Sequence, residues 1–111
     1  MKLGTEGESQ AAEYLKKQGY IILEQNYRAG RNEVDIICEK KGIVVFVEVK
    51  TRTTDNFGEP VEAVDSTKTR KIIKVAQSYL HNRDLWDKCK VRFDVIGINK
   101  DGINHIEDAF R

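Results

Sequence analysis

Two stretches of the chain repeat apolar residues at the spacing of an amphipathic helix. The first opens with Thr5 and Glu8, which form a capping box, and it stops at Gly19, so a helix is predicted over residues 6–18. Glu8 falls on the apolar stripe, and its carboxylate is therefore expected near the inner face of the helix, although capping alone would also explain it. The stripe consists of Ala11, Ala12 and Leu15.

The second helix is predicted to begin at Asp65 or Ser66 and to end near His81 and Asn82. Lys68 lies one turn before the first apolar residue, on the same face. Its ammonium group is expected either to contact a phosphate or to reach past the edge of the core while its stem packs on that edge. The apolar stripe consists of Ile72, Val75, Ala76, Tyr79 and Leu80.

Five runs rich in β-branched residues predict strands. Lys41 and Gly42 separate the second run from the third, which suits a two-residue hairpin turn with glycine in the left-handed conformation. Residues 28–32, RAGRN, are predicted to form a polar loop, and residues 51–65, which hold the only proline, a long connection. The runs are YIILEQNY (20–27), VDIIC (34–38), IVVFVEVK (43–50), VRFDVIGI (91–98) and INHIE (103–107).

The order of these elements is α-β-β-β-α-β-β, which predicts an α/β fold with a mixed central sheet and flanking helices. The third strand, the second helix and the fourth strand form a crossover, and such a connection joins parallel strands. We expect one domain spanning residues 1–111, because a chain of 111 residues supports one hydrophobic core.

Charged residues interrupt the apolar runs of the predicted hairpin. With two residues in the turn, Asp35 lies opposite Glu48. Glu33 lies opposite Lys50 in the same register, and all four side chains share one face. Like charges that face each other destabilise a strand pair, so we expect a compensating group. Mg²⁺ binds one or two carboxylates together with waters and phosphates, which suits Asp35 and Glu48. Glu8 or Glu33 would support them.

Lys50 would then orient an attacking water and stabilise the charge that develops on phosphorus. The alternative is an ion-pair cluster on a half-exposed sheet face, in which Lys50 neutralises one acid and solvent surrounds the others. For Glu33 the alternative to metal support is an ion pair with Lys50 or with an arginine of the preceding loop.

The formal net charge of +1 is an argument against a strongly basic nucleic-acid-binding protein. Nucleic-acid binding would therefore need a local basic patch, which three segments of the chain could form together. The alternative is that these residues are ordinary solvated surface. They are Arg28, Arg31, Lys50, Arg52, Lys68, Arg70, Lys71 and Lys74.

Other classes of protein fit the sequence poorly. No apolar run is long enough to span a bilayer and no signal-peptide pattern opens the chain, so a cytoplasmic location is expected. Cys38 and Cys89 lie far apart and are expected to be reduced, structural thiols.

Asp94 lies in a predicted central strand and is expected to be a structural acid with a partner such as Arg92 or a backbone donor. His105 alternates with an isoleucine and is expected to point to solvent.

The acid pattern resembles a nuclease motif. Asp35, with Glu48-Val49-Lys50 on the next strand, resembles the motif of the PD-(D/E)xK nuclease superfamily. The whole chain is similar to the YraN-like family of small bacterial endonuclease-like proteins, although Val34 stands where the superfamily motif has proline. The segments that carry the similarity are GESQAAEYLKKQGYIILEQNYR (7–28), NEVDII (32–37), VVFVEVKTR (44–52), AQSYL (76–80) and VRFDVI (91–96).

The resemblance implies a restriction-endonuclease-like fold, akin to that of archaeal Holliday-junction resolvases. It implies that Asp35, Glu48 and Lys50 form the catalytic core, that Glu8 lies near a Mg²⁺ or Mn²⁺ ion, and that the protein forms a homodimer. Two functions follow: an endonuclease that hydrolyses DNA phosphodiesters, on branched or single-stranded DNA, or a catalytically silent module of the same fold that binds nucleic acid or protein. The residues expected to contact nucleic acid are Arg28, Arg31, Arg52, Lys68 and Lys71.

Overall fold

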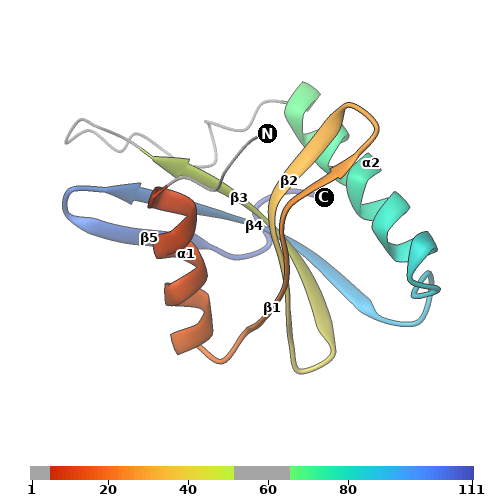
Figure 1. Cartoon of the computed structure of the whole chain (residues 1–111), viewed down its shortest axis with the longest axis horizontal. Helices are drawn as coiled ribbons and strands as arrows, with labels where there is room; N and C mark the ends of the chain where they lie inside the picture. Colours follow the sequence, from red (N-terminus) through yellow and green to blue (C-terminus); the bar gives the residue numbers. More distant parts are fainter. Residues whose placement is uncertain (1–5, 52–65) are drawn as a thin grey trace.

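The computed structural model describes residues 6–51 and 66–111, and in this part of the chain the elements follow the predicted order (Figure 1). Thr5 of the expected capping box, Arg52 and the long connection lie outside the described residues. The elements are α1 (Glu6–Lys17), β1 (Ile21–Ala29), β2 (Asn32–Lys40), β3 (Ile43–Thr51), α2 (Ser66–Asn82), β4 (Lys90–Asn99) and β5 (Gly102–Ile106).

The strands form one mixed sheet in the order β1-β2-β3-β4-β5. The crossover through α2 makes β3 and β4 parallel, as predicted, and the remaining neighbours are antiparallel. One helix covers each face of the sheet (Figure 1). The α1 side buries Leu15, Ile36 and Val47, whereas the α2 side buries Phe46 and Tyr79. The fold is therefore an α/β sandwich of three layers, in agreement with the sequence.

The turn between β2 and β3 sets the register that the sequence predicts. Lys41 and Gly42 have φ angles of 53° and 82°, so both turn residues adopt the left-handed conformation of a type I′ hairpin. Lys40 pairs with Ile43, and the same register continues along the hairpin.

The predicted loop at residues 28–32 is wrong, because strand pairing continues almost to the tip of this hairpin. Arg28 pairs with Glu33, and Ala29 pairs with Asn32. Only Gly30 and one further residue remain in the turn. Charged and polar residues at a hairpin tip have the composition of a loop. Their side chains can nevertheless extend into solvent from an edge strand without disturbing the backbone hydrogen bonds between β1 and β2.

The first residues of β2 separate from β3, and this part of the predicted register is wrong. In the described strands the β2–β3 ladder ends where Ile36 pairs with Val47, one step before Asp35 would face Glu48. The Asp35 side chain instead accepts a hydrogen bond of 2.8 Å from the backbone N–H of Val49. A side chain thus replaces the next ladder bond, and the β1–β2 hairpin leans toward α2 (Figure 1).

Within the described residues, neither helix is long and apolar enough to cross a membrane.

Candidate functional site

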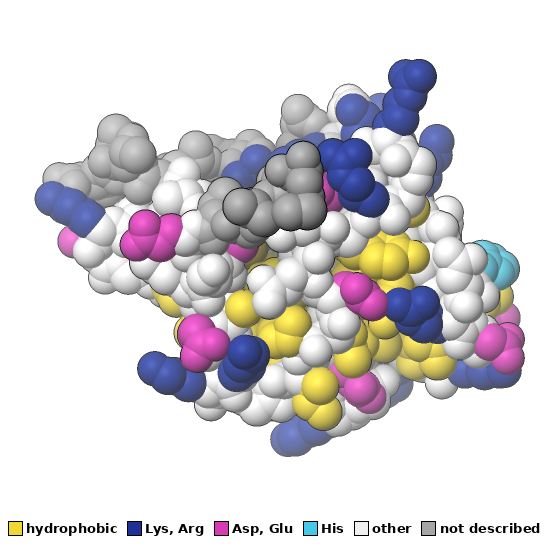
Figure 2. All heavy atoms as spheres, viewed as in Figure 1, with side chains coloured by type: hydrophobic (Ala, Val, Ile, Leu, Met, Phe, Trp, Pro, Cys, Tyr) yellow, Lys and Arg dark blue, Asp and Glu magenta, His cyan; other side chains and the backbone are white. Residues whose placement is uncertain are grey.

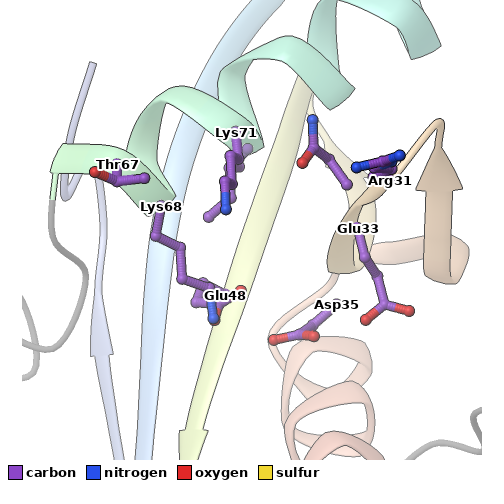
Figure 3. Close-up of a pocket in the computed structure, with 9 residues that line it drawn as sticks. Arg31, Glu33, Asp35, Glu48, Thr67, Lys68 and Lys71 are labelled. Atoms are coloured by element: carbon purple, nitrogen blue, oxygen red, sulfur yellow. The ribbon is translucent and has the colours of Figure 1, made fainter.

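A cavity of about 450 Å³ lies where β2 separates from β3, and the first turns of α2 close its other side (Figure 3). Its walls therefore come from the β2–β3 hairpin and from α2, which follows later in the sequence. The lining residues are Arg31, Asn32, Glu33, Asp35, Glu48, Thr67, Lys68, Lys71 and Ile72.

Two acids of the predicted catalytic core, Asp35 and Glu48, line this cavity from neighbouring strands. Both are buried, with 7% and 3% of their surface exposed. Glu48 follows the buried Phe46 at the two-residue period of a strand and so faces α2. Two carboxylates this deeply buried require compensating partners, because removing a charge from water is costly unless it is paired.

Two lysines supply the compensation at Glu48. Lys68 Nζ, from the first turn of α2, makes an ion pair with Glu48 Oε2, and Lys50 Nζ lies 3.6 Å from the same oxygen. Burial lowers the pKa of Lys68, but the hydrogen bond and charge of Glu48 outweigh this effect and raise the pKa overall. Burial and the positive charge of Lys68 lower the pKa of Lys50, against the opposing effect of Glu48. Lys68 is thus the closer partner of the acid.

Glu33 takes the alternative role expected from the sequence. Its carboxylate lies 3.6 Å from Arg28 Nε, and the side chain of Arg28 is exposed. Glu33 also lines the cavity, next to Asp35 on the same strand (Figure 3). It therefore adds negative charge to the wall of the cavity.

Basic side chains stand on two opposite walls of the cavity. Arg31 extends from the tip of the β1–β2 hairpin, and Lys71 lies one turn after Lys68 on α2; Arg31 and Lys71 are both exposed. Figure 2 shows Lys and Arg side chains gathered over this end of the molecule, near the hairpin tip and the start of α2. The acids at the bottom are therefore reached past a positively charged rim, which is suited to an anionic ligand.

Not every predicted site residue reaches the cavity. Its described lining does not include Lys50 or Glu8, although Glu8 is buried on α1 with 5% of its surface exposed. Within residues 6–51 and 66–111, no three side chains of the His, Cys, Asp and Glu types gather closely enough to hold a metal ion. Asp35 and Glu48 nevertheless fit a hard cation, since Mg²⁺ needs only one or two carboxylates and retains several waters. The ammonium group of Lys68 already forms an ion pair with Glu48, so an ion bound there would share this acid with a lysine.

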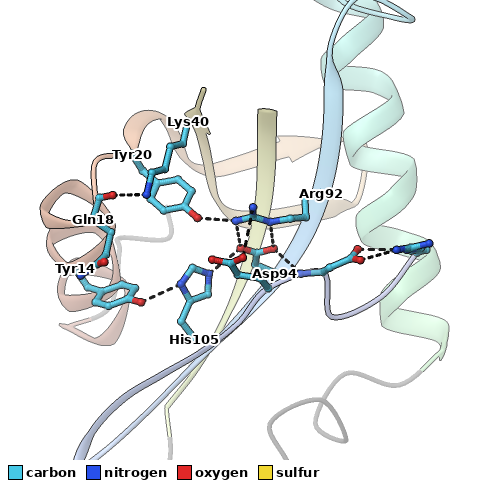
Figure 4. A network of polar contacts seen from close by, with 10 residues as sticks. Tyr14, Gln18, Tyr20, Lys40, Arg92, Asp94 and His105 are labelled. Carbon is cyan, nitrogen blue, oxygen red and sulfur yellow. Dashed lines mark hydrogen bonds and ion pairs between the residues drawn. The ribbon is translucent and has the colours of Figure 1, made fainter. Parts of the chain in front are cut away.

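A second polar cluster lies on the α1 side of the sheet (Figure 4). The fully buried Asp94 accepts two hydrogen bonds from Arg92, at 2.9 and 2.8 Å, and one of 3.0 Å from the backbone N–H of Asp108, as the sequence led us to expect. His105 Nε2 lies 2.7 Å from Asp94 and its Nδ1 lies 3.0 Å from the Tyr14 hydroxyl. The expectation that His105 points to solvent is wrong, because β5 turns this side chain beneath α1.

Comparisons with known proteins agree on one family. The profile described as "Uncharacterised protein family UPF0102" matches residues 7–98. A UPF0102 protein of Persephonella marina is 50% identical over 107 residues, covering 96% of this chain and 91% of that protein. One from Chlorobium phaeobacteroides is 50% identical over 96 residues, covering 86% of this chain and 75% of that protein.

A weaker likeness comes from solved structures. The structure of Pyrococcus furiosus SfsA in complex with Ca²⁺ aligns with 87% of this chain, at a TM-score of 0.32 and 14% identity, and this chain spans 58% of its length. A likeness at this level supports no conclusion about function.

Proposed function

Because the chain belongs to the family UPF0102, whose description assigns no activity, we propose from its cavity that it is a metal-dependent endonuclease-like protein that binds nucleic acid and hydrolyses DNA phosphodiesters. The substrate we favour is branched or single-stranded DNA. The location we propose is the cytoplasm.

One observation carries the proposal: two buried carboxylates from adjacent strands open into a cavity with a positively charged rim. Burying these carboxylates is costly to the fold, which needs a backbone N–H at Asp35 and two lysines at Glu48 to compensate them. A phosphodiester and a divalent cation together complement this arrangement. Phosphate oxygens would meet Arg31 and Lys71, and the cation would meet Asp35 and Glu48.

The residues divide the chemistry among them in this proposal. Asp35 and Glu48 would hold Mg²⁺ or Mn²⁺, and Glu8 would support the site from α1. When bound, the ion polarises the phosphoryl oxygen and lowers the pKa of a water molecule. Lys50 orients the attacking water and stabilises negative charge in the transition state. Arg28, Arg31 and Arg52 contribute to nucleic-acid binding, together with Lys68 and Lys71.

The rival function is a catalytically silent module that binds nucleic acid or a protein partner through the same rim. The contact between Glu48 and Lys68 favours it, since this acid has a counter-ion without any metal. In this case the acids serve the fold, and Asp35→Asn or Glu48→Gln leaves nucleic-acid affinity unchanged. A homodimer is compatible with both functions, and sedimentation would test it.

Cleavage of end-labelled DNA separates the two functions. Duplex, nicked, flapped, four-way-junction and single-stranded substrates are incubated with Mg²⁺, Mn²⁺ or EDTA. We expect metal-dependent products with the wild type and a loss of about 100-fold or more with Lys50→Ala, because general acid–base contributions have this size. Asp35→Asn should abolish cleavage while its amide oxygen still accepts the bond from Val49.

The matched control is Lys88→Ala, which removes an exposed lysine outside the cavity. This variant should cleave like the wild type. Products that persist in both Lys50→Ala and Asp35→Asn would come from a contaminant. DNA binding without any product would leave the silent module as the function.

A further inference from the structure

We propose that Lys68 is a built-in counter-cation of Glu48. A divalent cation must displace Lys68 in order to bind Glu48, so metal binding depends on the movement of the Lys68 side chain. The inference rests on the proposed function, because it concerns the metal that the endonuclease would use.

The geometry makes Lys68 the competitor for the metal position. Its Nζ contacts Glu48 Oε2 directly, whereas Lys50 Nζ lies 3.6 Å from that oxygen, beyond a hydrogen bond. Lys68 lines the same cavity as Asp35 and Glu48, and in Figure 3 its side chain extends from α2 down to Glu48. The ammonium group thus occupies the cavity side of the acid, which is the side open to an incoming ion.

Burial decides which partner moves. The side chain of Glu48 is 4% exposed, and β3 holds it within the sheet, whereas the side chain of Lys68 is 42% exposed. A lysine has four rotatable stem bonds, so Lys68 can turn its head toward solvent without opening the core. The pair can therefore separate by a rotation of Lys68 alone.

Electrostatic repulsion makes the Lys68 ammonium group and a divalent cation compete for Glu48. A divalent cation and an ammonium group that share one carboxylate oxygen would repel each other strongly in a poorly solvated site, so an ion at Glu48 Oε2 would drive Lys68 away. The ammonium group compensates Glu48 when no metal is bound, and within residues 6–51 and 66–111 the other lysine near this buried acid is the more distant Lys50. Metal affinity is therefore reduced by the free energy needed to break the ion pair.

A released Lys68 has a second partner available. It would turn into a cavity that Arg31 and Lys71 already make suitable for a phosphate. A phosphate that attracts Lys68 frees Glu48 for the metal, and a bound metal frees Lys68 for the phosphate. Because such coupling is reciprocal, metal and nucleic acid should each strengthen the binding of the other.

The test is the affinity of Mn²⁺ for the protein without nucleic acid, measured by electron paramagnetic resonance at fixed ionic strength. We expect Lys68→Met to bind Mn²⁺ tighter than the wild type by about tenfold or more, because the ion no longer has to displace an ammonium group from a buried carboxylate. Lys71→Met is the matched control. It removes the same charge from the same cavity wall, one turn further along α2 than the ion pair of Lys68 with Glu48, and should tighten binding by only about twofold through the general field.

Two outcomes separate this inference from the proposed function. In the first, the wild type binds Mn²⁺ and Glu48→Gln abolishes this binding, but Lys68→Met binds the ion no tighter than Lys71→Met does. This result would overturn the role of Lys68 and leave the metal site standing. An absence of Mn²⁺ binding in the wild type and in both lysine variants would remove the metal site and this inference with it.

A second measurement on the wild type protects the test from a variant that folds poorly. Lysines are ¹³C-methylated, and the Lys68 resonance is assigned by its loss in Lys68→Arg. Titration with Mg²⁺ should shift the Lys68 resonance at the concentration at which Glu48 binds the ion, whereas the resonance of the exposed Lys88 should not move. A Lys68 resonance that stays unchanged at saturation would overturn the displacement.

Discussion

At the scale of single residues, Asp94 is the acid on which the α1 side of the structure depends most. Its side chain is inaccessible to solvent and is held by Arg92, His105 and the backbone of Asp108 (Figure 4). Burial alone would raise the pKa of this carboxyl, but the hydrogen bonds from His105, Arg92 and Asp108 outweigh burial and lower it. Folding therefore favours the charged form of the Asp94 carboxyl group.

We predict that Asp94→Asn lowers the free energy of unfolding by about 3 kcal/mol, because removing one partner of a buried ion pair leaves the other uncompensated. The depressed pKa means that the unfolded chain binds more protons than the folded one, so the contribution of Asp94 is present above about pH 4 and disappears as the pH falls through the folded pKa. Urea denaturation at neutral and acid pH should therefore show a steeper acid loss for the wild type than for Asp94→Asn.

The control for this prediction is Asp84→Asn. The side chain of Asp84 is 91% exposed and pairs with Lys88 on the surface, so the loss should stay below about 0.5 kcal/mol. Equal losses in the two variants would mean that the cluster around Asp94 contributes nothing beyond an exposed ion pair.

The sequence predicts part of this cluster and misses the rest for a physical reason. An aspartate inside a central strand must have a partner, and Arg92, two residues away on the same face, is the nearest candidate. The burial of His105 is not predictable in the same way. It depends on how far α1 covers β5, which is a matter of packing between elements that are distant in the chain.

At the scale of elements, the contact between α1 and the end of β3 depends on a glycine. A Cβ atom at position 7 would clash with Oγ1 of Thr51 and approach Ile98 to 3.8 Å. Glycine therefore lets the helix lie directly on the sheet, and it sets the position of the neighbouring Glu8.

We predict that Gly7→Ala destabilises the protein by about 1–3 kcal/mol, the usual cost of overpacking, although alanine is the better helix former. The sign should change in a Thr51→Ala background, where the clashing oxygen is absent and the helix propensity of alanine remains. Thermal denaturation of the two single variants and the double variant measures this coupling. Additive losses would show that the glycine is not needed for the approach of α1 to β3.

The hairpins show which features of an element the sequence can predict. Hydrophobic periodicity and a Lys41-Gly42 turn were sufficient for the order of the elements and for the register up to Ile36 and Val47. The separation of β2 from β3 was not predictable, because it depends on one hydrogen bond between the Asp35 side chain and a backbone N–H. That separation creates the cavity, so the sequence placed Asp35 and Glu48 on neighbouring strands but could not predict the shape of the cavity that they line.

At the scale of the whole molecule, the distribution of charge matters more than its sum. The formal net charge is only +1, yet Arg31 and Lys71 stand on opposite walls of one cavity. The 18 acidic side chains of the sequence nearly balance its 19 lysines and arginines. The lining also includes three acids, of which Asp35 and Glu48 are buried, so a nucleic acid that approaches the cavity would meet the exposed Arg31 and Lys71 first.

We therefore predict that DNA binding weakens with salt and that the cavity rim accounts for much of this dependence. Each phosphate contact contributes about 0.9 to the slope of the logarithm of the association constant against the logarithm of salt concentration. Arg31→Gln and Lys71→Gln should each reduce this slope for duplex DNA by about that amount, whereas Lys88→Gln should leave it unchanged. Fluorescence anisotropy at several salt concentrations measures the slopes without requiring cleavage. DNA binding that does not change with salt concentration would contradict a nucleic-acid surface and favour a protein partner. Equal changes of slope in all three variants would mean that the phosphate contacts are spread over the surface rather than centred on the cavity.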